Sequence, residues 1–348
     1  MPELRLQLDV MERNAARMAN AIRALGKDWR PHVKSHSHPE IAAILKRHGA
    51  CGATCATIGE VEAMADAEMA SALLAHMVVN ESDLNRLASL TQKISLLLTI
   101  DHFVHAERIS ETAQREGVEF RVLVDVNIGM NRTGVRPRVD AVRLAAAAHK
   151  LPGVSVCGIM GYEGHLLRIP DEAEKQKSIF ESMNALEQTR DAFHQQDVPC
   201  DIVSAGGSGS FWITGQHPAV TELQAGGGIF GDPFYTEQCG LTDVEPALIM
   251  KADVVSRPAL DRAVLNVGRK EINPVLQEPR ILNLPDAVIA SMSAEHTVLN
   301  VDGESRDLRI GDTVELAVGY ADHSLLMHRR IQVYDGSAHV DTWSVVRE

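Results

Sequence analysis

Two glycine-rich stretches, Asp201-Ile-Val-Ser-Ala-Gly-Gly-Ser-Gly-Ser210 and Glu222-Leu-Gln-Ala-Gly-Gly-Gly228, decide the fold of this 348-residue chain. They are the last two of eight short apolar runs, which lie at residues 29–34, 49–57, 70–79, 95–101, 120–127, 155–162, 200–207 and 222–230. An open, doubly wound sheet places its glycine-rich loop after the first strand, whereas a closed barrel often binds phosphate after the seventh and eighth strands. The positions of these glycines therefore favour a TIM-type (β/α)8 barrel over a doubly wound sheet.

The segments between the apolar runs have the pattern of amphipathic helices. Apolar residues recur at spacings of three and four in 39–49, 81–93 and 138–150, and strands that alternate with helices form parallel sheets. After about residue 240 the pattern changes to short alternating strands separated by Gly, Asp and Pro, which predicts a compact β domain. We expect an N-terminal strand at 1–9 that pairs with the C-terminal domain, a barrel at 10–238 and a C-terminal β domain at 239–348.

The composition argues against several classes of protein. The net charge is −13, from 34 basic and 47 acidic residues without a block of like charge, so nucleic acid is not an expected partner. The five cysteines form no Cys-x-x-Cys pair, and their odd number argues against a disulfide framework, which favours a reducing cytoplasm. Charges interrupt the N-terminal segment, and no apolar run approaches the roughly 20 residues that span a bilayer. We therefore expect a cytoplasmic protein without a signal peptide or membrane anchor.

A lysine stands at the end of the first apolar run, in Arg30-Pro-His-Val-Lys34. Active sites of such barrels lie at the C-terminal ends of the strands, so we expect Lys34 at that edge and partly buried. Partial burial favours a neutral amine, which attacks carbonyl groups. The alternative is a solvated surface lysine.

The two glycine-rich stretches suit an anion. Small residues let backbone N–H groups surround it, and the hydroxyls of Ser208 and Ser210 can donate to it. A flexible linker is the alternative interpretation. A nucleophilic lysine on the same barrel edge as a phosphate site describes a site for a phosphorylated aldehyde, and pyridoxal 5'-phosphate fits this description. We predict that Lys34 holds this cofactor as a Schiff base.

Several motifs along the chain point to one family. They are His32-Val-Lys-Ser-His36, Ala56-Thr-Ile-Gly-Glu60, Asp125-Val-Asn-Ile-Gly-Met-Asn-Arg-Thr-Gly134, Gly161-Tyr-Glu-Gly-His165 and the Ser204–Ser210 cluster. Together they resemble the D-threonine aldolase and D-serine dehydratase family, which comprises pyridoxal-phosphate-dependent enzymes of fold type III with an N-terminal barrel like that of alanine racemase. The resemblance runs from about Leu6 to the C-terminus.

The resemblance implies roles for particular residues. Lys34 would carry the cofactor, Arg132 would lie near its ring, and Tyr162 would line the pocket and take part in catalysis. Without the family, Arg132 is an ordinary ion-pair partner and Tyr162 an ordinary core residue. Relatives of this kind imply a homodimer. The full set of expected cofactor-binding residues is His32, Lys34, Arg132, Tyr162, Ser204, Gly206, Gly207, Ser208, Gly209, Gly226 and Gly227.

The family also binds a divalent metal (Mn, Mg or Zn) through a histidine and an Asp or Cys two residues further on. His323 matches that histidine, but the position two residues on is Leu325, which cannot bind a metal. Asp322 or His328 is the remaining candidate for a second ligand. A strand at this point would place Asp322 and His323 on opposite faces, which counts against that pair. Without a metal, His323 would act as an acid or base.

The resemblance implies a lyase that acts on D-3-hydroxy amino acids. The first expectation is retro-aldol cleavage to glycine and an aldehyde, with Lys34, Tyr162 and His323 as the catalytic residues. A dehydratase of the D-serine or 3-hydroxyaspartate type is the second, and an amino-acid racemase the third. A non-catalytic carrier of pyridoxal phosphate is disfavoured, because its relatives lack a C-terminal β domain.

Overall fold

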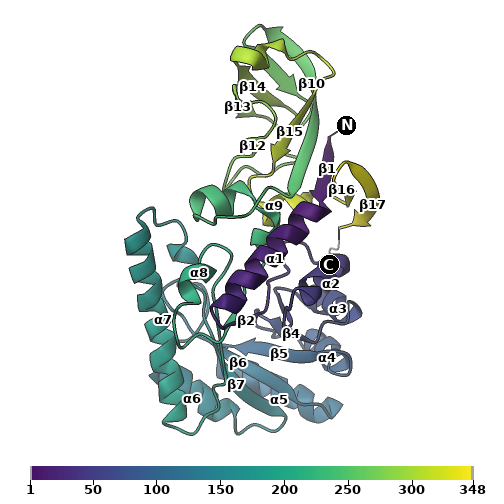
Figure 1. Cartoon of the computed structure of the whole chain (residues 1–348). Helices are drawn as coiled ribbons and strands as arrows, with labels where there is room; N and C mark the ends of the chain where they lie inside the picture. Colours follow the sequence, from purple (N-terminus) through teal and green to yellow (C-terminus); the bar gives the residue numbers. More distant parts are fainter. Residues whose placement is uncertain (1, 346–348) are drawn as a thin grey trace. The chain divides into compact units, whose positions relative to one another are not determined.

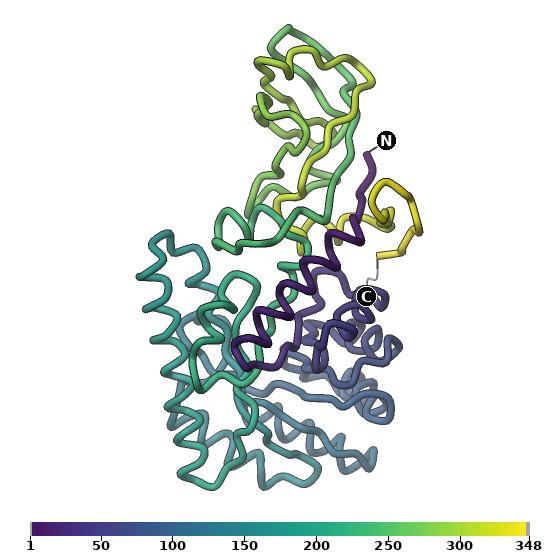
Figure 2. The backbone as a smooth tube through the Cα atoms, viewed as in Figure 1, coloured from purple at the N-terminus to yellow at the C-terminus, as the bar shows by residue number. Residues whose placement is uncertain are grey.

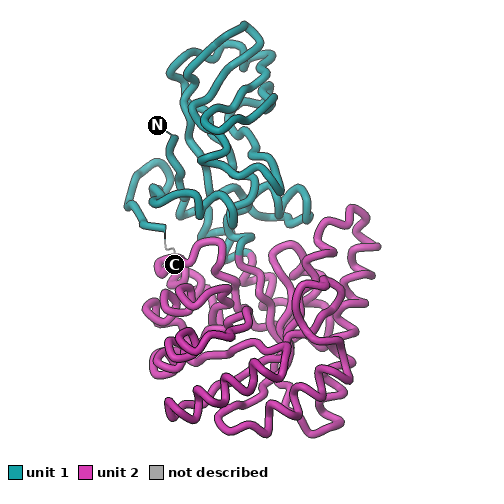
Figure 3. Tube along the Cα trace, turned by 180° about the vertical axis from the view of Figure 1, so that it is seen from behind, with its two compact units in different colours: residues 1–17, 227–347 teal, residues 18–226, 348 magenta. Residues whose placement is uncertain are grey.

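The computed structural model describes residues 2–345, which form two compact units (Figure 3). Met18–Gly226 is called the barrel unit here, and the chain up to Arg17 together with the chain from Gly227 onward is called the β unit. The domain boundaries expected after residues 9 and 238 stay a prediction. Within residues 2–345, no helix is both long and apolar enough to cross a bilayer.

Eight parallel strands form the sheet of the barrel unit (Figure 1). Their order is β2-β9-β8-β7-β6-β5-β4-β3, so the first strand lies beside the last. A bridge between His32 and Thr54 joins the two ends of the sheet, where the Val33 N–H donates to Thr54 O at 2.8 Å. This topology confirms the predicted (β/α)8 barrel. The strands are β2 (Asp28–Trp29), β3 (Ala53–Cys55), β4 (Ser71–Leu74), β5 (Ser95–Ile100), β6 (Phe120–Asp125), β7 (Val154–Met160), β8 (Ile202–Ala205) and β9 (Glu222–Leu223).

Helices connect successive strands, and their ends follow local sequence signals. The side chain of Thr57 accepts the Glu60 N–H at the start of α3 (Ile58–Asp66), and α5 (Phe103–Glu116) ends at Gly117, whose φ of 66° lies in the left-handed region that favours glycine. The helix α1 (Leu8–Ala24) begins in the β unit and ends in the barrel unit. The others are α2 (Pro39–Arg47), α3 (Ile58–Asp66), α4 (Glu81–Leu90), α5 (Phe103–Glu116), α6 (Val139–Ala148), α7 (Glu172–His194) and α8 (Phe211–Thr214).

Each strand of the barrel is buried on both faces. Helices cover its outer face, and side chains from the other strands pack against its inner face. Leu73, Leu97, Leu123 and Met160 come from four different strands and pack into one cluster. Such strands consist almost wholly of apolar residues. Lysine, tyrosine, serine and glycine at the strand ends are therefore exceptions to the local pattern.

The β unit contains a sheet of nine strands. Its N-terminal strand, β1 (Glu3–Gln7), pairs antiparallel with β10 (Leu248–Ala259) and parallel with β16 (Arg330–Asp335). Figure 2 shows this first segment beside one of the last strands of the chain. The other strands are β11 (Arg262–Leu265), β12 (Arg280–Ile281), β13 (Ala287–Met292), β14 (Thr297–Val301), β15 (Thr313–Ala317) and β17 (Ala338–Ser344).

Candidate active site

Lys34 lies in the turn that follows β2, at the C-terminal edge of the barrel sheet. Its backbone N–H lies 3.3 Å from His32 Nδ1, and the His32 backbone N–H donates to Gln224 O at 3.0 Å. Lys34 is exposed and His32 half-buried. The partial burial expected for Lys34 is therefore wrong.

The second glycine-rich stretch lies directly against the strand that carries Lys34. A Cβ atom at Gly226 would lie 2.0 Å from the backbone oxygen of His32, so only glycine fits there. A buried ion pair holds the same two strands together, because Arg30 Nε lies 2.9 Å from both carboxylate oxygens of Glu222. The sheet order, with β2 next to β9, thus brings Gly226 to the lysine turn.

Residues 206–210 form a tight loop after β8. Gly206 has a φ of +75°, the Gly207 N–H donates to Ser210 Oγ at 3.1 Å, and the Ser210 N–H donates to Gly207 O at 3.1 Å. Ser208 and Gly209 are buried. Within residues 2–345, the Gly209 N–H has no protein acceptor. The loop therefore keeps a buried donor for a ligand.

Ser204 is fully buried at the end of β8. Its hydroxyl accepts a hydrogen bond from the Gln224 side-chain amide at 2.9 Å, and its carbonyl accepts the Gly161 N–H at 3.1 Å. Ser204 thus links its own strand to the segments that follow β7 and β9. A place beside the cofactor stays a prediction for this residue.

Arg132 and Tyr162 meet near this loop. The Arg132 guanidinium carbon lies 5.9 Å from the centre of the Tyr162 ring. A Cβ atom at Gly207 would lie 3.0 Å from the same ring, so the tyrosine packs on the loop. The structure therefore brings together three residues that the sequence analysis assigned to the cofactor.

Asp125 was not assigned a role from the sequence, although it opens one of the quoted motifs. It ends β6, lines a cavity with Arg132 and Tyr162, and accepts a hydrogen bond from Thr133 Oγ1 at 2.7 Å. Burial raises the pKa of Asp125. A carboxyl group with a raised pKa in a cavity at a strand end is a candidate site residue.

Two buried charged residues hold the loop and were also missed. Glu163 is fully buried and accepts hydrogen bonds from Ser210 Oγ at 2.7 Å and from Thr214 Oγ1. Lys175, on α7, donates to Gly209 O at 2.9 Å. Glu163 lies inside the Gly161–His165 motif, which is a usable signal, whereas no feature of the sequence distinguishes Lys175 from Lys177, the other lysine of its helix.

The segment that contains His323 is helical, which corrects the strand expected there. Residues Ala321–Ser324 form the short helix α9, and Leu325–Met327 continue it as a 3-10 turn, η5. His323 is exposed, and its ring centre lies 4.8 Å from that of Tyr320. The argument that a strand separates Asp322 from His323 is therefore wrong for this chain.

The donors around His323 do not fit a metal site. Leu325 is fully buried and has no donor atom, and His328 Nε2 lies 2.7 Å from the backbone oxygen of Glu271. Asp322 accepts the Tyr320 hydroxyl at 2.7 Å. Across residues 2–345, no group of three or more His, Cys, Asp or Glu side chains is placed to hold a metal ion.

Gly227 differs from the other expected phosphate-site residues in its location. It opens the 3-10 helix η2 (Gly227–Phe230), which belongs to the β unit together with Asp322, His323 and His328. The remaining expected residues all lie in the barrel unit.

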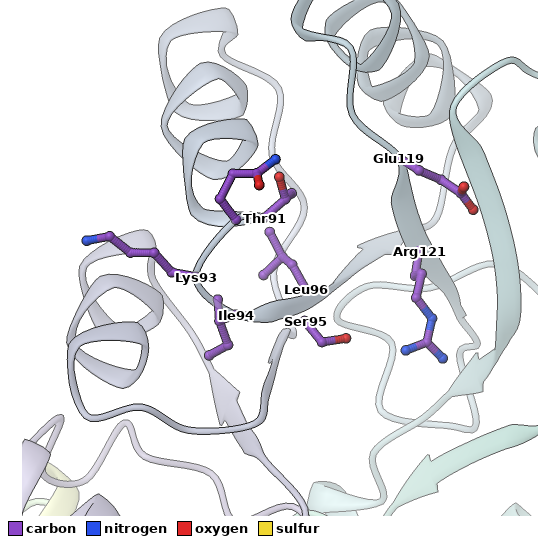
Figure 4. Close-up of a pocket in the computed structure, with 8 residues that line it drawn as sticks. Thr91, Lys93, Ile94, Ser95, Leu96, Glu119 and Arg121 are labelled. Carbon is purple, nitrogen blue, oxygen red and sulfur yellow. The ribbon is translucent and has the colours of Figure 1, made fainter.

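A second hollow lies at the opposite edge of the barrel (Figure 4). It measures about 420 Å³ and is lined by residues 91–96 with Glu119 and Arg121, at the starts of β5 and β6. In barrels of this type the N-terminal edge contributes to stability, and catalysis takes place at the C-terminal edge. The hollow is therefore not the candidate active site.

The barrel residues fit pyridoxal phosphate. Lys34 offers an exposed amine, Gly209 offers a buried N–H donor, and Gly226 allows an approach that a Cβ atom would block. Backbone N–H groups and small residues are the usual means of binding a phosphate.

The family model described as alanine racemase, N-terminal domain, matches residues 6–233. The chain belongs to this family. A serine dehydratase domain model matches residues 247–334, within the β unit. These matches confirm the family that the motifs indicated.

Individual relatives of this family member match along most of its length. A D-threonine aldolase from Arthrobacter sp. is 27% identical over 99% of this chain and 91% of its own. A D-threo-3-hydroxyaspartate dehydratase from Delftia sp. (strain HT23) is 28% identical over 74% of this chain and 68% of its own. The crystal structure of D-threonine aldolase from Filomicrobium marinum superposes with a TM-score of 0.93 at 29% identity, over 99% of this chain and 95% of the other. The similarity thus includes both units.

Proposed function

We propose that the chain is a pyridoxal-phosphate-dependent lyase that cleaves D-3-hydroxy amino acids to glycine and an aldehyde. The observation that carries the proposal is the cluster at the C-terminal edge of the barrel, where Gly226 packs against the His32 backbone two residues before Lys34 and Gly209 keeps an unused donor. Two of the relatives described above are named as aldolases and one as a dehydratase, and both activities are those of lyases.

The barrel residues have separable tasks in this proposal. Lys34 would hold the cofactor covalently, and the Gly209 N–H and the Gly226 backbone would hold its phosphate. Arg132 and Tyr162 would orient the ring, since each contacts the other or the loop. When bound, pyridoxal phosphate draws electrons from the α-carbon of the attached amino acid, and the protein selects which bond to that carbon breaks.

Retro-aldol cleavage also needs a base for the proton of the β-hydroxyl group. An imidazole can take that proton near neutral pH, and His323 is the histidine that the resemblance assigns to this task. We propose no step through a metal, because the donors around His323 do not fit one.

Dehydration is the second candidate activity, because one relative is named as a D-threo-3-hydroxyaspartate dehydratase. It breaks the Cα–H bond and then releases the β-hydroxyl group, so it needs a group that donates a proton to the leaving oxygen. The two activities give different products from one substrate. A racemase would give neither product.

The experiment that tests the proposal incubates purified protein and pyridoxal phosphate with D-threonine, D-phenylserine and D-threo-3-hydroxyaspartate. Glycine with an aldehyde identifies the aldolase, and a keto acid with ammonia identifies the dehydratase. L-threonine serves as the stereochemical control, and Lys34→Ala as the control for cofactor attachment. If only the inverted amino acid appears, the lyase proposal is wrong and a racemase replaces it.

We also propose that the protein is cytoplasmic and forms a homodimer, and that it binds a small amino-acid substrate. All five cysteines are free thiols, which suits a reducing compartment. The dimer is proposed by analogy with related folds. Sedimentation of the purified protein at several concentrations measures its oligomeric state.

A further inference from the structure

Lys175 is an unusual lysine, because only 4% of its surface is exposed. Its ammonium group donates to Gly209 O at 2.9 Å and lies 5.0 Å from the centre of the Trp212 ring. Burying an ammonium ion is costly unless other groups compensate the charge. This charge thus contacts the loop 206–210 and the aromatic ring two positions beyond it.

Glu163 contacts the same loop. Its carboxylate accepts hydrogen bonds from Ser210 Oγ and Thr214 Oγ1, and the Gly206 N–H lies 3.4 Å from its second oxygen. These contacts use donors at both ends of the loop. They leave the buried Gly209 N–H without an acceptor within the described residues 2–345.

The loop itself has no positive charge. Residues 206–210 are glycine and serine only, so they offer neutral N–H and O–H donors. A phosphate monoester carries close to two negative charges at neutral pH. In a buried, low-dielectric setting a cation a short distance away lowers the energy of such an anion far more than it would in water.

We propose that Lys175 is the positioning residue of the phosphate site: it fixes the Gly209 carbonyl and supplies the positive charge that keeps the bound phosphate as a dianion. The inference rests on the proposed function, because it assumes that the 206–210 loop holds the phosphate of pyridoxal phosphate. Lys175 acts through the Gly209 backbone and has no part in bond breaking.

The test compares two aldehydes that differ only in the phosphate group. Apoprotein is titrated with pyridoxal phosphate and with pyridoxal, and the visible absorbance of the aldehyde bound at Lys34 gives each Kd. Lys175→Gln removes the charge but keeps a donor for Gly209 O, and Lys175→Arg keeps the charge. Lys177→Gln is the matched control, since Lys177 lies on the same helix with 77% of its side chain exposed.

We expect Lys175→Gln to raise the Kd of pyridoxal phosphate at least tenfold and the Kd of pyridoxal less than twofold. Lys175→Arg should stay within threefold of the wild type for both aldehydes, and Lys177→Gln should match the wild type. An equal loss of affinity for both aldehydes in Lys175→Gln would show a merely structural role and overturn the proposal. Unchanged affinity for pyridoxal phosphate would overturn it too.

A second measurement needs no variant, in case Lys175→Gln does not fold. The 31P chemical shift of the bound cofactor in the wild-type protein should stay constant between about pH 5.5 and 8, whereas a free phosphate monoester titrates near pH 6. A bound phosphate that titrates like the free one contradicts the role of Lys175. A wild-type protein that takes up neither aldehyde at Lys34 refutes the proposed function itself, before any variant is compared.

Discussion

The edge of the barrel and the segment around α9 both contain residues that the sequence analysis assigned to the active site, yet the predictions for the two regions fared differently. At the barrel edge, Lys34, Tyr162 and the 206–210 loop all follow strands, where the repeating pattern placed them. Around α9, an expected strand is a helix, and the two candidates for a second metal ligand, Asp322 and His328, make hydrogen bonds within the protein. A repeated architecture thus makes a residue's position predictable, and an isolated connection does not.

The sharpest test of the barrel edge is Lys34→Ala. Loss of the only attachment point proposed for the cofactor should remove its visible absorbance and lower kcat more than 1000-fold, which exceeds about 4 kcal/mol in transition-state stabilisation. Absorbance spectra and product assays measure both effects. Lys177→Ala serves as the control, and Lys34→Ala protein that keeps the absorbance would refute the assignment.

The close approach of the two barrel-edge strands is tested by Gly226→Ala. The added Cβ atom would lie 2.0 Å from the His32 backbone oxygen, so backbone must shift. We expect a loss of roughly 3 kcal/mol in the free energy of unfolding, measured with urea. Gly117→Ala is the comparison, because Gly117 has a positive φ but open space around it, and it should lose only about 1 kcal/mol.

The region of α9 should show its own dependence on pH. Burial raises the pKa of Asp232 to about 8, and its carboxyl group accepts the N–H of Ala321, the first residue of α9. The folded state therefore keeps a proton that the unfolded chain loses near pH 4, so stability falls as pH rises from about 4 to 8.

Between pH 6 and 8 this dependence amounts to roughly 2 kcal/mol for a single group. Urea unfolding at several pH values measures it. Asp232→Asn, which cannot ionise, should lack this part of the slope even if it is less stable overall. Equal slopes for the two proteins would contradict the raised pKa.

The smallest expected effect concerns His323. If this exposed residue is the base for the β-hydroxyl proton, His323→Ala should lower kcat about tenfold to 100-fold and leave the Kd of pyridoxal phosphate unchanged. Chelation should leave wild-type activity unchanged. A loss of activity that Mn²⁺ or Zn²⁺ restores would show that the residues around α9 do bind a metal.

The difference between the two regions has a physical origin. The periodicity of apolar residues predicts strands and helices because it reflects burial along one segment. The helix α9 depends instead on Asp232, which binds its first N–H from 89 positions earlier in the chain. A contact of that kind leaves no periodic signal.

The same argument explains which site residues the sequence could reveal. Lys34 and the glycines stand at the ends of apolar runs, where a lysine or a group of glycines is easily recognised. Lys175 sits in a helix in which polar residues are common, and only the fold shows that its side chain faces the Gly209 carbonyl. Asp125 and Glu163 were visible within quoted motifs, but burial and hydrogen bonding distinguish them, and both arise in three dimensions.

The pairing of β1 has a consequence for the order in which the chain folds during synthesis. Translation releases Glu3–Gln7 well before the partners of this strand, which are Leu248–Lys251 and Gln332–Tyr334. The barrel unit is contiguous from Met18 to Gly226, so it can fold while the ribosome is still producing the rest. The strand β1 can thus pair only after the barrel unit has been made, and deletion of Glu3–Gln7 should damage the sheet formed by the later strands.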